Sequence, residues 1–126
     1  LKPQDLIEFC TIDFESILYK KATPQQRSDL IRFNLLFLHG GIWLDASTIV
    51  YENLDWIQDL IRKERTNCFA YYRKNNTTNM SYPVIETWLL ASTQGNVFFK
   101  YWLEELWNAI ELTPKGYIQN IADRGL

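Results

Sequence analysis

The chain has 126 residues, of which 47% are hydrophobic, 15% aromatic and 22% charged, and its formal net charge is −2. This composition excludes a disordered chain, because the apolar surface is large enough to offset the entropy of ordering. The balanced charge excludes a protein held on nucleic acid by a clustered excess of Lys and Arg, and no apolar run approaches the ~18 residues of a membrane span.

The first third of the chain predicts helices. Residues 3–21 carry two short helical patterns, and Asp13 is the expected N-cap of the second. Thr23–Pro24 predicts the N-cap and first position of a longer helix that runs to His39. It ends at Gly40, a residue suited to the left-handed conformation after a helix. Apolar side chains point almost all round its axis, so it is expected to be buried.

The middle of the chain alternates between strand and helix patterns. β-Branched and aromatic residues indicate three strands, with a helix or turn between the first two and a polar loop between the last two. In chain order the expected ranges are 42–51 with a break near Ala46 and Ser47, then 54–63, 67–73, 74–82 and 84–92. Strands that alternate with helices favour an α/β fold with a mostly parallel sheet flanked by helices.

The clearest amphipathic pattern covers residues 94–112. Apolar side chains recur there at four-residue intervals, at Phe98, Trp102, Leu106 and Ile110. Thr113–Pro114 is expected to end this helix, and the residues after it are not assigned to an element.

Two charged residues stand in the otherwise apolar helix of residues 24–39. Asp29 and Arg32 lie three residues apart and therefore share one helix face. In one interpretation they form an ion pair within the helix, because a buried charge is costly unless it is paired. In the other, both project into a cleft and hydrogen-bond a polyhydroxylated or phosphorylated ligand.

The segment HGGIWLDAST carries the second candidate feature. Gly40 and Gly41 permit a tight reversal and the close approach of another backbone or a ligand. Asp45 stands toward the end of a hydrophobic strand, where open α/β sheets bind their ligands. It could instead cap a turn with Ser47 and Thr48. A carboxylate beside a hydroxyl is also a modest oxygen site for Mg or Mn, completed by phosphates and water.

The segment SDLIRFNLLFLHGGIWLDAST resembles the region around the DXD motif in nucleotide-sugar glycosyltransferases of the GT-A fold. It is most similar to the capsular polysaccharide synthesis family and its relatives, the Och-type mannosyltransferases and the clostridial toxin glucosyltransferases. The family pattern is present at Ser28, Asp29, Arg32, Gly40, Gly41, Trp43 and Asp45. A weaker resemblance continues in IETWLLASTQGNVFFKYWLEELW, where a strand with a carboxylate leads into a long helix.

The resemblance implies a GT-A core that transfers a sugar from a nucleoside-diphosphate sugar to a saccharide acceptor in capsular or surface polysaccharide synthesis. Asp29, Arg32 and the two glycines would bind the donor sugar. Asp45, the first acid of the motif, would face the ribose, the sugar or the metal-bound diphosphate. Ser47 stands where the toxins and mannosyltransferases have a second, metal-binding Asp. Mn or Mg would therefore bind through Asp45 with Ser47 as a weak ligand.

The remaining candidates are a carboxylate, a histidine and several aromatic rings. Glu86, in the third expected strand, could orient the acceptor or act as a base, or simply face solvent from a half-buried strand. The lone histidine, His39, is expected to serve the end of its helix or the packing. Tyr71, Tyr72 and Trp88 could stack on a sugar or lie in the core.

The resemblance also bears on domain organisation and location. The 126 residues are expected to form a single glycosyltransferase core domain or a truncated copy, without the N-terminal strand that binds the nucleotide base in GT-A enzymes. Cys10 and Cys68 are expected to be free thiols in a reducing compartment. The expected location is the cytoplasm, at the inner face of the membrane in a bacterium, or the Golgi lumen in a eukaryote.

Two other functions compete with that of a glycosyltransferase. Ser47 in place of an acid and the missing nucleotide-binding strand are compatible with a non-catalytic carbohydrate- or partner-binding module derived from such an enzyme. The sequence LDAST also resembles the aspartyl nucleophile of haloacid-dehalogenase phosphatases. That chemistry needs a second acid two residues after the first, and Ser47 cannot supply it.

Overall fold

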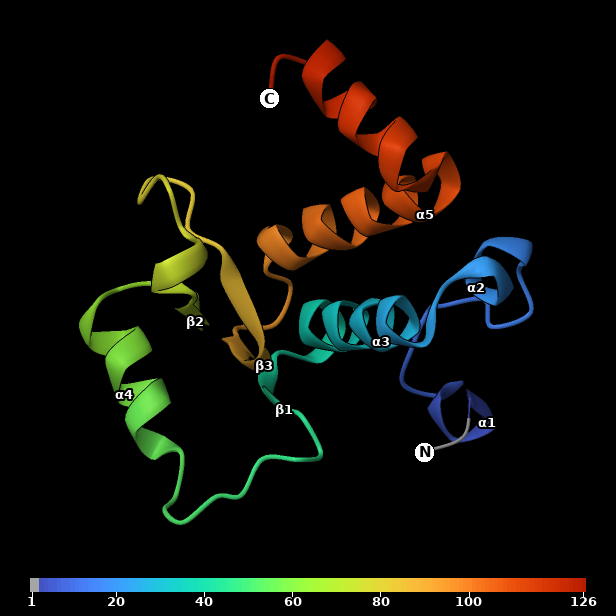
Figure 1. Cartoon of the computed structure of the whole chain (residues 1–126). Helices are drawn as coiled ribbons and strands as arrows, with labels where there is room; N and C mark the ends of the chain where they lie inside the picture. The colour runs from blue at the N-terminus through green and yellow to red at the C-terminus, as the bar shows by residue number, and fades with distance from the viewer. Residues whose placement is uncertain (1–2) are drawn as a thin grey trace. The chain divides into compact units, whose positions relative to one another are not determined.

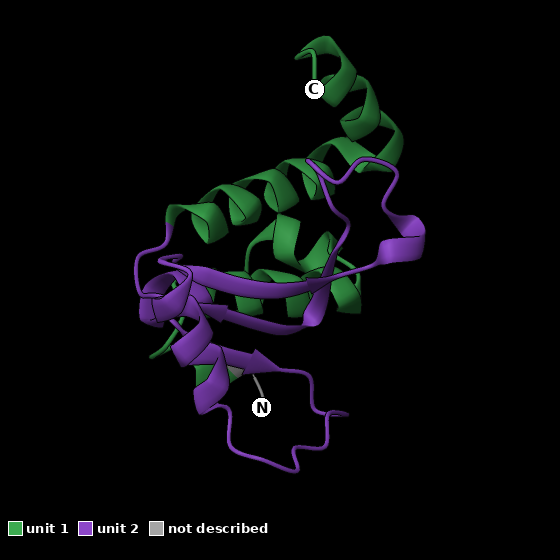
Figure 2. Ribbon diagram, turned by 90° about the vertical axis from the view of Figure 1, so that its left-hand side faces the viewer, with its two compact units in different colours: residues 1–35, 97–126 green, residues 36–96 purple. Residues whose placement is uncertain are grey.

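The structure is a computed structural model that describes residues 3–126. The chain divides into two compact units, coloured separately in Figure 2. Unit 1 combines the N-terminal part of the chain up to Leu35 with residues Val97–Leu126, and unit 2 is the continuous segment Leu36–Asn96. Within residues 3–126, no helix is both long enough and apolar enough to cross a membrane.

Unit 1 begins with the two short helices predicted from the sequence, α1 (Pro3–Leu6) and α2 (Ile17–Lys21). The expected N-cap is corrected, because the hydroxyl of Ser16 accepts the Tyr19 N–H at 3.2 Å. Asp13 stands too far before the helix for that role. Its carboxylate accepts the Glu15 N–H at 3.0 Å and so shapes the turn that precedes the cap.

The long helix α3 (Pro24–His39) has the predicted bounds. Its first turn is closed by a reciprocal capping box. The Thr23 hydroxyl accepts the Gln26 N–H at 3.2 Å, and the Gln26 side-chain oxygen accepts the Thr23 N–H at 2.9 Å. The prediction of burial is confirmed for one stripe of the helix, which includes Leu30, Phe33 and Leu36.

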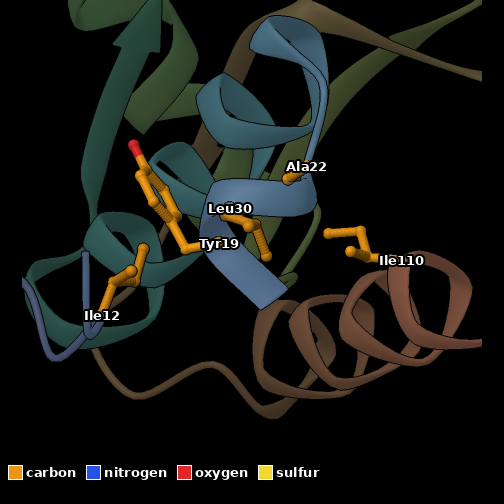
Figure 3. Packing of buried hydrophobic residues seen from close by; sticks show 5 residues of the cluster. All are labelled: Ile12, Tyr19, Ala22, Leu30 and Ile110. Carbon is orange, nitrogen blue, oxygen red and sulfur yellow. The ribbon is translucent and has the colours of Figure 1, made fainter. Parts of the chain in front are cut away.

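The core of unit 1 joins side chains from α2, α3 and the C-terminal helix α5 (Val97–Asp123). Figure 3 shows the cluster, which consists of Ile12, Tyr19, Ala22, Leu30 and Ile110. A second aromatic contact extends it, since Phe33 stacks on Trp102 with ring centroids 4.2 Å apart. The four-residue apolar spacing in α5 predicted the inward-facing stripe in part: Leu106 and Ile110 pack in this core and Trp102 stacks on Phe33, whereas Phe98 is 42% exposed.

The first segment of α5 ends at Thr113–Pro114, as predicted, because Thr113 has non-helical backbone angles of φ 67° and ψ 159°. The chain turns there, as Figure 1 shows, and a second helical segment, which was not predicted, runs on to Asp123. Pro114 then suits the first position of a new helical segment, where its missing N–H is not needed. The two segments are tied together by Glu105, which accepts hydrogen bonds from Arg124 at 2.8 Å and from the Tyr117 hydroxyl at 2.7 Å.

Unit 2 contains a three-stranded sheet of β1 (Gly41–Leu44), β2 (Cys68–Tyr72) and β3 (Ile85–Ser92). The three predicted strands are confirmed, but the prediction of a mostly parallel sheet is wrong. The strand order is β1-β3-β2, and both ladders are antiparallel. β1 and β2 run in the same direction, as a crossover through α4 (Asp55–Lys63) would give. β3 lies between them, and so they do not pair with each other.

The first strand is shorter than predicted. It stops at Leu44, and the residues from Asp45 to Thr48 form a turn closed by the Thr48 N–H and the Asp45 carbonyl at 2.9 Å. Ile49 and Tyr51 are exposed beyond the strand. The small core of unit 2 lies between α4 and the sheet, around the buried residues Ile57, Leu89 and Ala91.

The end of α3 is held by the turn that follows β3. Two carbonyls of its last turn accept hydrogen bonds from that turn: Phe37 from the Gly95 N–H at 2.8 Å, and Leu38 from the Gln94 side-chain amide at 2.9 Å. The Leu36 carbonyl accepts the Gly40 N–H at 2.9 Å, as in a regular helix end. The turn thus satisfies carbonyls that the helix leaves without a partner. The start of β1 is thereby fixed.

The two cysteines, Cys10 and Cys68, are both free thiols, as expected. Cys10 is half-buried, and burial raises the pKa of its thiol. A thiol with a raised pKa is protonated near neutral pH and is a poor nucleophile. Cys10 therefore serves the packing of unit 1.

Candidate functional site

Asp29 and Arg32 lie on α3 in unit 1 and form the ion pair that the first interpretation predicted. The Arg32 guanidinium is 3.3 Å from the Asp29 carboxylate and donates to the Ser28 hydroxyl at 3.2 Å. The Arg32 side chain is only 6% exposed, whereas that of Asp29 is 31% exposed. The carboxylate is therefore the more accessible member, and contact of this pair with a ligand stays a prediction.

The two glycines have different surroundings. A Cβ on Gly40 would lie 2.6 Å from the Gln94 backbone nitrogen and 2.9 Å from the Ser92 carbonyl oxygen. The close approach predicted for this residue is thus made by another stretch of backbone. Gly41 has no atom within 4 Å of such a Cβ, and its φ of 94° alone favours glycine. Of the two, Gly41 has room for a ligand.

Asp45 is the first residue after β1, and three hydrogen bonds fix it. Its N–H donates to the Trp88 carbonyl at 2.9 Å, which places the two residues opposite each other across β1 and β3. Its carbonyl closes the turn to Thr48. Its carboxylate accepts the Trp43 indole N–H at 2.9 Å. Asp45 remains partly exposed, so the strand ends in an oriented carboxylate that solvent reaches.

The residues around Asp45 offer few ligands for a metal ion. Ser47 is exposed, and its neutral hydroxyl is a weaker ligand for Mg or Mn than a carboxylate. In the described part of the chain, no three His, Cys, Asp or Glu side chains gather closely enough to hold a metal ion. One carboxylate and one hydroxyl therefore fit a cation that takes most of its ligands from a bound diphosphate and from water.

Glu86 lies on β3 and pairs with Arg73, just after β2. The Arg73 Nε–H donates to the Glu86 carboxylate at 2.7 Å, and this bond raises the pKa of the guanidinium. The Glu86 side chain is 23% exposed, so it is neither buried in the core nor fully solvated. The two residues line a cavity of about 390 Å³ together with Lys74, Asn75 and Asn76.

The aromatic candidates divide into a stacked pair and two other exposed residues. The Tyr71 and Trp88 rings stack with centroids 5.3 Å apart and planes only 10° from parallel. Their residues remain 40% and 37% exposed, so neither lies in the core. Tyr72 is also exposed, and so is His39, at the end of α3.

Unit 2 brings several predicted site residues onto neighbouring strands. Asp45 is opposite Trp88, and Glu86 is two residues away from Trp88 along β3. Asp29 and Arg32 belong to unit 1. Sequence reasoning missed Arg73 and the two amides of the following turn. A hairpin prediction for residues 67–92 would have paired β2 with β3, but the register shift between Ala70 and Tyr72 conceals the pairing of Arg73 with Glu86.

Comparison with known proteins gives a consistent class. Residues 4–114 match the family described as "Capsular polysaccharide synthesis protein". The O-glycosyltransferase braB of Annulohypoxylon truncatum is 31% identical over 90 residues, which cover 67% of this chain and 21% of that protein. The glycosyltransferase afumC of Aspergillus fumigatus is 33% identical over 82 residues, which cover 64% of this chain and 20% of that protein.

The matched region is a small part of these relatives, since it spans about a fifth of their length. No solved structure matches the chain.

Proposed function

The chain belongs to the capsular polysaccharide synthesis protein family, and on this premise we propose that it carries the core of a glycosyltransferase. The reaction proposed is transfer of a sugar from a nucleoside-diphosphate sugar to a saccharide acceptor. The observation that carries the proposal is the family match over residues 4–114, supported by two relatives named as glycosyltransferases. The proposed setting is capsular or surface polysaccharide synthesis, in the cytoplasm of a bacterium or the Golgi lumen of a eukaryote.

The proposed fold is a part of a GT-A core. Its support is the family match and not the sheet, because both ladders of the described sheet are antiparallel. A residue just past the carboxyl end of a strand is the proposed place for ligand contact. Asp45 occupies that position after β1.

The proposed reaction sets two requirements for the protein. Positive charge develops at the anomeric carbon of the donor, and negative charge develops on the departing diphosphate. The Asp45 carboxylate, oriented by the Trp43 indole, would face the donor and stabilise the first of these charges. Asp29, Arg32, Gly40 and Gly41 are the proposed donor-sugar residues. The salt bridge from Asp29 and the Ser28 hydroxyl hold the Arg32 guanidinium in one orientation.

Mn or Mg is the proposed cofactor, bound as a complex with the donor. Asp45 and Ser47 would hold the ion, and the diphosphate and water would supply its other ligands. When bound, the ion supplies charge neutralisation for the leaving diphosphate. The protein's own part is to fix Asp45: the Trp43 indole N–H donates to its carboxylate, and its backbone N–H donates to the Trp88 carbonyl.

Glu86 is proposed to orient the acceptor hydroxyl or to take its proton. Its carboxylate lies on the strand that also carries Trp88, opposite Asp45. The bond from Arg73 holds it in place, because a charge-assisted hydrogen bond is among the stronger polar contacts in proteins.

The proposal is tested by assaying the whole protein against a panel of nucleoside-diphosphate sugars. Mass spectrometry would detect donor hydrolysis and transfer to saccharides, with and without Mn. We expect Asp45→Ala and Asp29→Ala to lose most of the turnover. The matched control is Asp59→Ala, an exposed carboxylate on α4 that pairs only loosely with Arg62, at 3.6 Å.

Full turnover in both Asp45→Ala and Asp29→Ala would overturn the proposal. Glycan binding without any transfer, and without dependence on nucleotide diphosphate or Mn, would favour the non-catalytic carbohydrate-binding module instead.

A further inference from the structure

The hairpin formed by β2 and β3 carries two consecutive cross-strand contacts of different chemistry. The first is the stack of Tyr71 on Trp88, and the second is the bond between Arg73 and Glu86. Each strand contributes residues two apart, and two residues of an extended chain span about 7 Å. The aromatic pair and the ion pair therefore adjoin, at a separation close to the size of one sugar ring.

The bond between Arg73 and Glu86 borders a cavity whose size and polar lining suit a sugar ring. Its volume is about 390 Å³, and it is lined by Arg73, Lys74, Asn75, Asn76 and Glu86. Amides, a carboxylate and cations together offer both donors and acceptors, which a ring of hydroxyl groups requires. A hydrophobic ligand would gain little from such walls.

The walls of the cavity are held in place by the turn that follows β2. The Thr77 hydroxyl donates to the Arg73 carbonyl at 2.7 Å and accepts the Val84 N–H at 3.1 Å, so it bridges the two ends of the loop. The short 3-10 helix η1 (Lys74–Asn76) supplies the two asparagines. A cavity with braced walls loses less entropy when it binds a ligand.

The stacked rings of Tyr71 and Trp88 supply an apolar surface beside the polar cavity. Both residues are more than a third exposed, although their rings stack on each other. A sugar ring has an apolar face of C–H groups and a polar rim, so it fits an aromatic surface bordered by hydrogen-bonding groups. Asp45 lies directly across from Trp88. A sugar ring bound on Trp88 would therefore have one edge toward Asp45, the residue proposed to face the donor.

We propose that Tyr71 and Trp88, together with the cavity lined by Arg73 and Glu86, form the subsite that binds the acceptor sugar. This inference rests on the proposed glycosyltransferase function. The occupant is a neutral pyranose ring. One face lies on the exposed aromatic surface, and the hydroxyls reach Asn75, Asn76 and Glu86. Arg73 is a positioning residue, because it acts through the Glu86 carboxylate.

The test is a titration of the whole protein by saturation-transfer NMR, without any nucleotide sugar. The probes are the methyl glycosides of glucose, galactose, mannose and N-acetylglucosamine. We expect at least one to bind, and we expect Trp88→Ala to weaken its affinity by about tenfold, while Trp88→Phe, which keeps a ring, stays within about threefold. The control is Tyr101→Ala, an exposed aromatic side chain on α5, which we expect to bind as the wild type does.

A second variant keeps the test decisive if Trp88→Ala does not fold. Arg73→Gln changes an exposed side chain, and we expect it to weaken the same glycoside by about fivefold, because Glu86 loses its orienting bond. The subsite is overturned if the wild type binds none of the four glycosides. It is equally overturned if Trp88→Ala and Arg73→Gln both bind the glycoside as the wild type does. Because no donor is present, these outcomes are independent of the transfer assay that tests the proposed function.

Discussion

The two units use their polar and aromatic side chains in different ways. In unit 1 the aromatic rings of Phe33 and Trp102 pack inside, and Glu105 and Arg124 bind each other across the bend of α5. In unit 2 the stacked rings of Tyr71 and Trp88 remain exposed, and the pair of Arg73 and Glu86 lines an open cavity. Stacked aromatic rings thus serve packing in the helical unit and are exposed to solvent in the sheet unit, and the ion pair of the sheet unit borders a cavity.

Core truncation in unit 1 should show the largest effect on stability. Phe33 is 2% exposed and contacts Phe99 and Trp102, so Phe33→Ala should lower the free energy of unfolding by about 3–5 kcal/mol. Chemical denaturation measures it. Phe98→Ala is the control, because Phe98 is 42% exposed and should cost less than half as much. Equal losses for the two variants would break the distinction between packed and exposed rings.

One position of unit 2 should behave like a core position. Gly40→Ala combines a φ of 67° with a contact of 2.6 Å to the Gln94 backbone, and it should lower the free energy of unfolding by about 2–3 kcal/mol. Gly41→Ala, with no atom within 4 Å, should cost about 1–2 kcal/mol from backbone conformation alone. A larger loss at Gly41 than at Gly40 would show that the end of α3 is not held by the turn after β3.

The smallest effect is expected from the ion pair that ties the two segments of α5. The hydrogen bonds from Arg124 and Tyr117 lower the pKa of Glu105 to about 2 from its ordinary 4.5. The stabilisation is therefore complete above pH 4.5 and is lost as the pH falls from 4.5 toward 2. Because both side chains are over a third exposed, screening by solvent keeps the contribution of the pair small.

Glu105→Gln should remove this pH dependence, as measured by unfolding at several pH values between 2 and 5. Glu104→Gln is the control, since Glu104 is 4.0 Å from Lys100 and should change little. A wild type and a Glu105→Gln variant with the same acid profile would mean that the bend is held by packing alone.

Local signals allowed most of the elements to be predicted. The capping box at Thr23 and Gln26 and the glycine at position 40 bracket α3 because both act within a few residues of the chain. The four-residue spacing of α5 likewise follows from the period of a single helix. The helix stop at Thr113–Pro114 was predicted in the same way, whereas the second helical segment that begins at Pro114 was not.

The sheet direction could not be obtained in the same way. The crossover through α4 does make β1 and β2 run in the same direction, but β3 comes later in the chain and pairs between them. This choice is made by contacts across the sheet, around Ile57 and Leu89, and not by any local pattern.

The candidate site shows the same limit. The motif pointed to Asp45 directly, whereas the partnership of Arg73 with Glu86 depends on the register of β2 and β3. That register contains an irregularity between Ala70 and Tyr72, which no sequence pattern marks.

The most direct test of the central claim, that Asp45 at the end of β1 acts in sugar transfer, compares activity with stability in Asp45→Asn. Asparagine keeps the shape of the side chain and removes its charge. We predict that kcat/KM for transfer from the nucleotide sugar falls by about 10²-fold or more, while the free energy of unfolding changes by less than about 1 kcal/mol. Transfer that stays within threefold of the wild type, or a loss matched by unfolding of the protein, would contradict the claim.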